Sequence, residues 1–148
     1  MSDELLVAAM RIAAGVDPVP AAVSADACAA LGLQLPGSIL AAPVPAEPGS
    51  GTRSLLSGTE FHRFAADGLT LTVEFELDAG LLRVSGQVTP PPGPGAWIEI
   101  RTPHLGKTRA PSDAGGYAVT SIPIGWLSVA CHRPPDPPVV TRWILARP

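Results

Sequence analysis

The chain has 148 residues, a length that suits one domain or one domain with a small appendage. Hydrophobic residues make up 46% of it and the net charge at pH 7 is −3. This composition excludes an intrinsically disordered chain and shows no basic footprint for nucleic acid. The 18 prolines and 15 glycines, mostly placed between apolar runs, indicate many short elements joined by turns.

The N-terminal residues predict two short helices. The first begins at a cap formed by Ser2 or Asp3 and closes at Gly15, with apolar residues recurring at helical spacing between them. The second begins at Asp17, with Pro18 in its first turn, and ends within 32–36. Both helices have small, alanine-rich apolar faces, so we expect them to pack on something larger.

The start of the chain and its cysteines bear on the compartment. The first residues are acidic, and Arg11 interrupts the apolar stretch, so we expect neither a secretory signal nor a membrane span. Cys28 and Cys131 are too few and too far apart for a disulfide framework or a zinc site. We therefore expect two buried, reduced thiols in a cytoplasmic protein.

Composition divides the chain into three parts. Residues 1–35 form the helical segment, 36–52 form a linker rich in proline and glycine, and 53–148 form a β domain. Within the linker, the segment 38–44 can be a strand or an extended stretch.

The clearest strand covers 69–77, where apolar and polar residues alternate as a half-buried sheet requires. Asp67-Gly68 before it and Ala79-Gly80 after it supply the corners of two hairpins. The next strand covers 81–88, and Gly86 within it marks a bulge or a close backbone approach.

Turn signals at regular spacing predict a mainly β, α+β protein: about seven antiparallel strands in a β-sandwich, preceded by the two helices. The remaining strands are expected at 96–101, 107–110, 116–120, 126–132 and 139–146. The proline-rich segment 90–95 is either a short polyproline ligand or a hairpin connection whose prolines prevent edge pairing.

Four short motifs stand at fixed offsets in the second half of the chain. They are Gly86-Gln87-Val88, Ala96-Trp97-Ile98-Glu99-Ile100, Asp113-Ala114-Gly115-Gly116-Tyr117 and Ile122-Pro123-Ile124-Gly125. From Val84 onward the chain thereby resembles the carboxypeptidase regulatory-like domains, which are seven-stranded sandwiches of the transthyretin (prealbumin) type.

Two turns of that pattern have a physical reading. Asp113 can bond backbone N–H groups of its turn, and Gly116 can take a conformation closed to other residues. Pro123 and Gly125 then reverse the chain into Trp126. These four positions are therefore interpreted as structural.

The complete layout is similar to small actinobacterial proteins of this family, which are found beside alternative sigma factors and CHAT-domain proteases. The resemblance implies a regulatory or accessory role and no catalytic activity. It also implies no cofactor and no metal, since these domains accompany carboxypeptidases without carrying their zinc ligands.

The residues themselves give the same expectation for chemistry. The three histidines, His62, His104 and His132, lack metal-ligand spacing, and Cys131 and His132 point to opposite faces of one strand. No activated serine motif is present. Glu74 and Glu76 share a strand face, where pairing with an arginine explains them better than catalysis does. The arginines considered for that pairing are Arg83, Arg101 and Arg142.

The tryptophans are the candidate interaction residues. Alternation places Trp97 and Trp126 on an outer sheet face, with Glu99 and Arg101 on the strand of Trp97, whereas Trp143 is expected in the core or at a strand end. The N-terminal helices, a second copy or a partner protein can cover such a face.

We therefore expect a binding or regulatory module that recognises a protein and neither nucleic acid nor membrane. A self-assembling structural component is the alternative, which leaves the oligomeric state open. A third hypothesis, a transthyretin-like hydrolase, lacks the C-terminal Tyr-Arg-Gly signature, because the chain ends Leu-Ala-Arg-Pro.

Overall fold

The structure of the protein is a computed structural model, and it describes residues 3–16, 20–32, 34–45 and 60–147. The chain separates into two compact units, Met1–Gln34 and Leu35–Pro148. The first unit holds two helices, α1 (Asp3–Val16) and α2 (Ala21–Gly32), at the positions predicted from the sequence. The predicted cap at Asp17-Pro18 lies outside the described residues.

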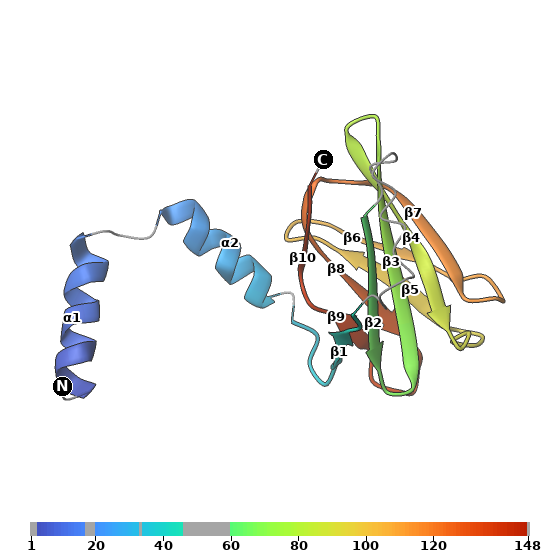
Figure 1. Ribbon diagram of the computed structural model, residues 1–148, viewed down its shortest axis with the longest axis horizontal. Helices are drawn as coiled ribbons and strands as arrows, with labels where there is room; N and C mark the ends of the chain where they lie inside the picture. Colours follow the sequence, from blue (N-terminus) through green and yellow to red (C-terminus); the bar gives the residue numbers. More distant parts are fainter. Residues whose placement is uncertain (1–2, 17–19, 33, 46–59, 148) are drawn as a thin grey trace. The chain divides into compact units, whose positions relative to one another are not determined.

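The second unit, the β-unit, contains all the strands of the described residues (Figure 1). Ten strands are described: β1 (Ile39–Pro43), β2 (Glu60–Ala66), β3 (Leu69–Asp78), β4 (Leu81–Thr89), β5 (Trp97–Arg101), β6 (Gly106–Arg109), β7 (Gly116–Ile122), β8 (Gly125–His132), β9 (Val139–Thr141) and β10 (Ile144–Ala146). They form one mixed, nearly closed, barrel-like sheet in the order β6-β5-β8-β9-β1-β2-β3-β4-β7, and β10 also pairs with β8.

The mainly β class with two short helices is confirmed, but the count of seven strands is wrong for the described chain. Part of the difference lies in segment 139–146, which is split into β9 and β10. The rest comes from β1 and β2. β1 lies inside the segment 36–52 expected as a linker, yet it pairs in parallel with β9 and antiparallel with β2. The linker residues from 46 onward lie outside the described part.

The two hairpin corners read from the sequence are present. Asp67 and Gly68 both have positive φ, at 52° and 69°, between β2 and β3. Ala79 and Gly80, at 50° and 83°, do the same between β3 and β4. Positive φ at both central residues is the geometry of the tight turn whose twist matches antiparallel strands. These turns fix the register of three consecutive strands.

The core fills the inside of the β-unit with apolar side chains from alternating strand positions. Leu71, Val73 and Val84 from one side and Ile98 and Val129 from the other have no exposed surface. Each fully buried side chain of this kind contributes roughly 1.5–3 kcal/mol relative to the exposed state. Strands from both ends of the sheet order therefore pack their apolar side chains into one core.

The path of strands ends at β6 and β7, and a lysine joins these two ends. In β7, Thr120 and Ser121 together face the single residue Arg83 of β4, a β-bulge that gives Ser121 a φ of 60°. The Lys107 Nζ of β6 donates hydrogen bonds of 3.0 Å to the carbonyl oxygens of both bulge residues. Ammonium hydrogen bonds are stronger than neutral ones, so this contact helps to close the sheet.

Gly86 lies at a close approach between strands, one of the two alternatives that its place in the sequence indicates. A Cβ at this position would lie 1.9 Å from the Thr72 carbonyl oxygen and 2.7 Å from the Tyr117 hydroxyl. The Tyr117 hydroxyl from β7 crosses β4 at the glycine and donates a 2.7 Å hydrogen bond to that oxygen of β3. The missing side chain thus lets one tyrosine connect three strands.

The turn before β7 differs from its predicted form by one residue. The Ser112 hydroxyl, rather than Asp113, accepts the Gly116 N–H at 3.0 Å. Gly115, with φ 87°, rather than Gly116, has the left-handed backbone, and a Cβ there would lie 2.2 Å from the Val88 carbonyl oxygen. Small residues at neighbouring positions make these roles hard to separate from the sequence.

The other predicted corner and the proline-rich segment also have definite places. Pro123 stands between β7 and β8, and Gly125 begins β8 with φ 133°, so both lie at the chain reversal before Trp126. Residues 90–95 join β4 to β5, two strands that are not paired with each other, so this segment is not a hairpin connection.

Replacing Gly86 by alanine tests the close approach. Since the Thr72 carbonyl is backbone and cannot move aside alone, we expect Gly86→Ala to lower the free energy of unfolding by about 3 kcal/mol. Gly106→Ala is the matched control, because its Cβ meets only the Glu99 Oε1 at 3.5 Å, an ordinary contact. Chemical denaturation of both variants measures the difference, and equal stabilities would contradict the proposed packing.

Alkaline unfolding tests the buried hydroxyl of Tyr117, the only tyrosine of the chain. Burial, with smaller contributions from Cys131 and Glu74, raises the pKa of Tyr117 far above its usual value. Above a pH of about 10 the unfolded chain releases this proton and the folded chain keeps it. The free energy of unfolding should therefore fall by up to about 1.4 kcal/mol per pH unit from that single group.

The variant Tyr117→Phe isolates this contribution. It should lose about 1–2 kcal/mol at neutral pH, because the Thr72 carbonyl loses its donor. Its stability should then decline less than that of the parent chain as the pH rises above 10. Parallel pH profiles for the two chains, or tyrosinate absorbance appearing in the folded parent near pH 10, would show that the hydroxyl is not held as described.

Candidate interaction surface

The outer face of β5 and β8 carries the two tryptophans singled out from the sequence. Ile98 and Ile100 of β5 and the alternate residues of β8 from Leu127 face the core. Trp97 and Trp126 therefore point to the opposite side, because successive side chains of a strand alternate. Their exposed fractions, 37% and 53%, agree with this placement.

Trp97 lies in a cluster with His132 and Glu99. It stands directly opposite His132 across the β5–β8 pair, and the two rings are stacked with centroids 4.6 Å apart and planes 9° apart. The His132 Nε2 is 2.8 Å from the Glu99 Oε2. The imidazole is thus held by the carboxylate and itself supports one face of the indole. We name these three residues the Trp97 cluster.

Trp126 lies at the other end of β8. It is opposite Leu145 of β10 and stands six positions before His132 along the strand. At about 3.3 Å per residue the two tryptophans are roughly 20 Å apart. Between them on the same face lie Ser128 and Ala130, which are fully buried. The tryptophans therefore mark two separate exposed places on one face.

Arg101, the fourth candidate interaction residue, does not belong to an exposed surface. It follows Glu99 by two residues on β5, but only 5% of it is exposed. The expectation that Arg101 lies beside Trp97 and Glu99 on an accessible face is therefore wrong. Trp143, between β9 and β10, is half-buried, as suits a residue at a strand end.

Two further pairs of charged or titratable side chains lie outside the Trp97 cluster in the described β-unit. His62 contacts Glu60 at 2.8 Å and packs beside Phe64 and Phe75, and Arg133 contacts Asp67 at 3.2 Å. Glu76 stands opposite Arg83, the predicted pairing partner, although their side chains form no ion pair among the described residues. Each contact joins one acid to one base, and the described residues contain no group of three suited to a metal.

His104, the third histidine, lies in the turn between β5 and β6. The Thr102 hydroxyl of that turn accepts the backbone N–H groups of His104 and Leu105 at 3.4 Å and 2.9 Å. The Thr102 hydroxyl therefore closes the turn. The His104 side chain is exposed, and no hydrogen bond or ion pair of the described residues involves it.

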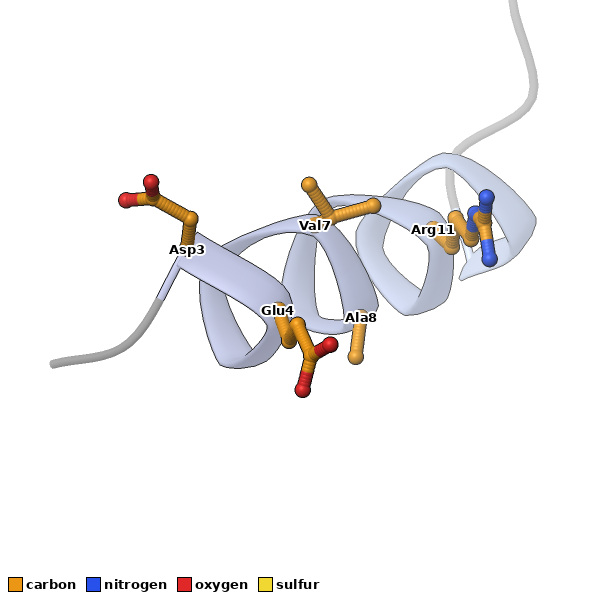
Figure 2. Close-up of a pocket in the computed structure, with 5 residues that line it drawn as sticks. All are labelled: Asp3, Glu4, Val7, Ala8 and Arg11. Carbon is orange, nitrogen blue, oxygen red and sulfur yellow. The ribbon is translucent and has the colours of Figure 1, made fainter.

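Figure 2 shows a shallow pocket along α1, where Asp3 and Glu4 of the first turn and Arg11 lie on one flank of the helix. All of its lining residues come from this single helix, so no second element closes over it. A second shallow pocket lies against the β6–β7 connection and includes Arg109, Ser112 and Tyr117. Neither pocket brings together a nucleophile and a base in the arrangement that catalysis needs.

Comparisons of the chain with protein-family models, with curated proteins and with solved structures give no match. Among the described residues, no helix has the length and apolar character needed to cross a membrane.

Sequence reasoning identified both tryptophans but missed the role of His132. The alternation of β8 places His132 on the face opposite Cys131, which is correct. Its partners lie on β5, however, more than 30 residues earlier in the chain. Register between strands that are not joined by a hairpin is what decides this contact, and no local pattern encodes it.

The two cysteines differ in the structure, and thiol reactivity tests that difference. Cys131 is buried as predicted, whereas the prediction for Cys28 is wrong, because it is exposed on α2. Burial raises the pKa of Cys131, against the opposing influence of Arg133, and only the thiolate reacts. We expect a disulfide reagent to modify Cys28 at once and Cys131 only on unfolding, with Cys28→Ser removing the fast phase. Two equally fast thiols in the folded chain would contradict this.

Proposed function

We propose that the protein is a non-enzymatic regulatory or accessory module that binds another protein through the outer face of β5 and β8. The observation that carries the proposal is the exposure of Trp97 and Trp126 on strands whose opposite face fills the core. Tryptophan is enriched at binding hot spots because it buries a large apolar area with few rotatable bonds. An exposed tryptophan on a rigid strand is thus a ready anchor.

Two further observations support a binding role over catalysis. His132 holds the indole of Trp97 in one orientation, so little side-chain entropy remains to be lost when a partner binds. Each of the three ion pairs described above joins one acid to one base, and none of them adds a third charged group. Such pairs stabilise a surface but provide no reaction site.

We also propose that the β-unit is related to the carboxypeptidase regulatory-like sandwiches and acts in the cytoplasm. The motif segments fall on β4, on β5, at the start of β7 and at the β7–β8 corner, which is the order that the family pattern has. The two unpaired cysteines suit a reducing compartment. The resemblance then suggests a sigma factor or a CHAT-domain protease system as the setting of the partner.

Self-assembly is the second candidate function, and the helical unit favours it. Leu5, Met10 and Ile12 of α1 are all exposed within the described chain. Exposed apolar residues of this kind can be covered by a second copy. Size-exclusion chromatography with light scattering separates the candidates, because self-assembly gives a defined oligomer of the purified chain and the binding module does not require one.

Affinity purification with matched variants tests the binding proposal. We expect the parent chain to recover one stoichiometric protein from its native source. The purified partner should then bind Trp97→Ala and Trp126→Ala at least tenfold more weakly, the size of a hot-spot loss. Phe61→Ala is the control, because Phe61 is 52% exposed on β2, away from β5 and β8.

The proposal fails if the partner binds all three variants equally, or if Phe61→Ala alone weakens it. Isothermal titration with the purified partner gives these affinities directly. Circular dichroism of each variant shows whether the fold is intact, so that a loss of binding is attributed to the surface.

A further inference from the structure

We propose that the Trp97 cluster is a receptor for a cationic side chain of the partner, and that arginine fits it best. This inference rests on the proposed function, because it specifies the chemistry recognised at one end of the same surface. It is carried by the joint placement of an exposed indole, a carboxylate and an imidazole on two paired strands.

The indole of Trp97 has one supported face and an exposed remainder. His132 covers one face in a nearly parallel stack, and 37% of the tryptophan is in contact with solvent. The electron-rich face of tryptophan attracts cations more strongly than that of any other aromatic residue. Because the imidazole fixes the ring, the open part presents a constant orientation to a ligand.

The carboxylate of Glu99 can accept hydrogen bonds in addition to its contact with His132. That contact uses Oε2, whereas Oε1 would lie 3.5 Å from a Cβ at Gly106 of the neighbouring strand β6, and 25% of the Glu99 side chain is exposed. Arg101, two residues along β5, forms no ion pair within 4.0 Å with Glu99 in the described part of the chain. A partly exposed carboxylate, with one oxygen outside the His132 contact, therefore stands two residues from Trp97 on the same face of β5.

This combination selects a cation over an apolar group. An apolar anchor placed on Trp97 would remove water from Glu99 and return no hydrogen bond, which costs free energy. A guanidinium is planar, stacks on aromatic rings and donates several N–H groups to a carboxylate. An arginine side chain can therefore contact the indole and the Glu99 Oε1 at once.

Trp126 provides the internal comparison. It lies roughly 20 Å away on the same face, opposite Leu145 and close in sequence to the exposed Ile124. This end of the surface suits an apolar contact, so a cationic ligand should leave Trp126 unaffected.

Titration with a small cationic probe tests the proposal. The three tryptophans of the full chain give three indole N–H resonances in a nitrogen-15 NMR spectrum, and Trp97→Phe and Trp126→Phe assign two of them. N-acetyl-arginine amide should shift the Trp97 resonance with a dissociation constant of about 10–100 mM, as expected for one cation–π contact and one exposed ion pair. N-acetyl-citrulline amide, the neutral isostere, should not shift it.

Variants of the cluster sharpen the result. Glu99→Gln keeps the size of the side chain and removes its charge, so the arginine probe should bind about two- to fivefold more weakly while the spectrum stays dispersed. Added salt should weaken binding to the parent chain in the same direction. Trp126→Phe should bind the probe as the parent chain does.

Three results would overturn the inference: equal shifts with the citrulline probe, an unchanged affinity in Glu99→Gln, or a response at Trp126 in place of Trp97. If the arginine probe fails while Trp97→Ala still loses the partner, the proposed function stands and only the cation receptor is rejected. If the probe binds while no tryptophan variant affects the partner, the proposed function fails instead.

Discussion

Alternation along β5 and β8 is the constraint on which the rest of the β-unit depends. The core requires Ile98, Ile100 and the odd-numbered residues of β8 to face inward. Because the period of a strand is two residues, the same requirement turns Trp97, Glu99, Trp126 and His132 outward. A shift by one residue would expose the aliphatic side chains and bury a charged cluster. The outward position of both tryptophans is therefore a consequence of core burial.

The two ends of this surface have different chemistry although one strand carries both. At one end an aromatic ring is supported by a second ring and flanked by an acid; at the other end a tryptophan lies beside aliphatic residues. Small buried residues separate them. A partner of ordinary interface size can reach both places, and the difference between them would fix its orientation, since each end accepts a different group.

Much of the β-unit can be predicted from local sequence. The errors of that prediction have physical causes. β3 and its two flanking turns were predictable because alternation and residues suited to positive φ occur within a few positions. The close approach at Gly86 was also indicated, since a glycine inside a strand needs a reason. The strand count, the pairing of β1 with β9 and the burial of Arg101 depend on contacts between distant segments.

In the candidate surface, too, local features could be predicted and contacts between distant segments could not. The outward position of each tryptophan follows from its own strand, and a single sequence suffices for it. The stack of Trp97 on His132 requires the register of β5 against β8, which the core sets and which no short motif reveals. The one-residue error in the turn before β7 has another origin, because serine, aspartate and two glycines in succession offer equivalent hydrogen bonds and backbone freedom.

Closure of the sheet through Lys107 has a chemical consequence. It is the only lysine of the chain, and its ammonium group is committed to two backbone carbonyls of the β7 bulge. Acylation of this amine, by a reagent or by an enzyme, would remove the charge and leave those carbonyls with a weaker donor. Modifying the Lys107 amine would therefore weaken the contact between β6 and β7, the two strands at the ends of the described path.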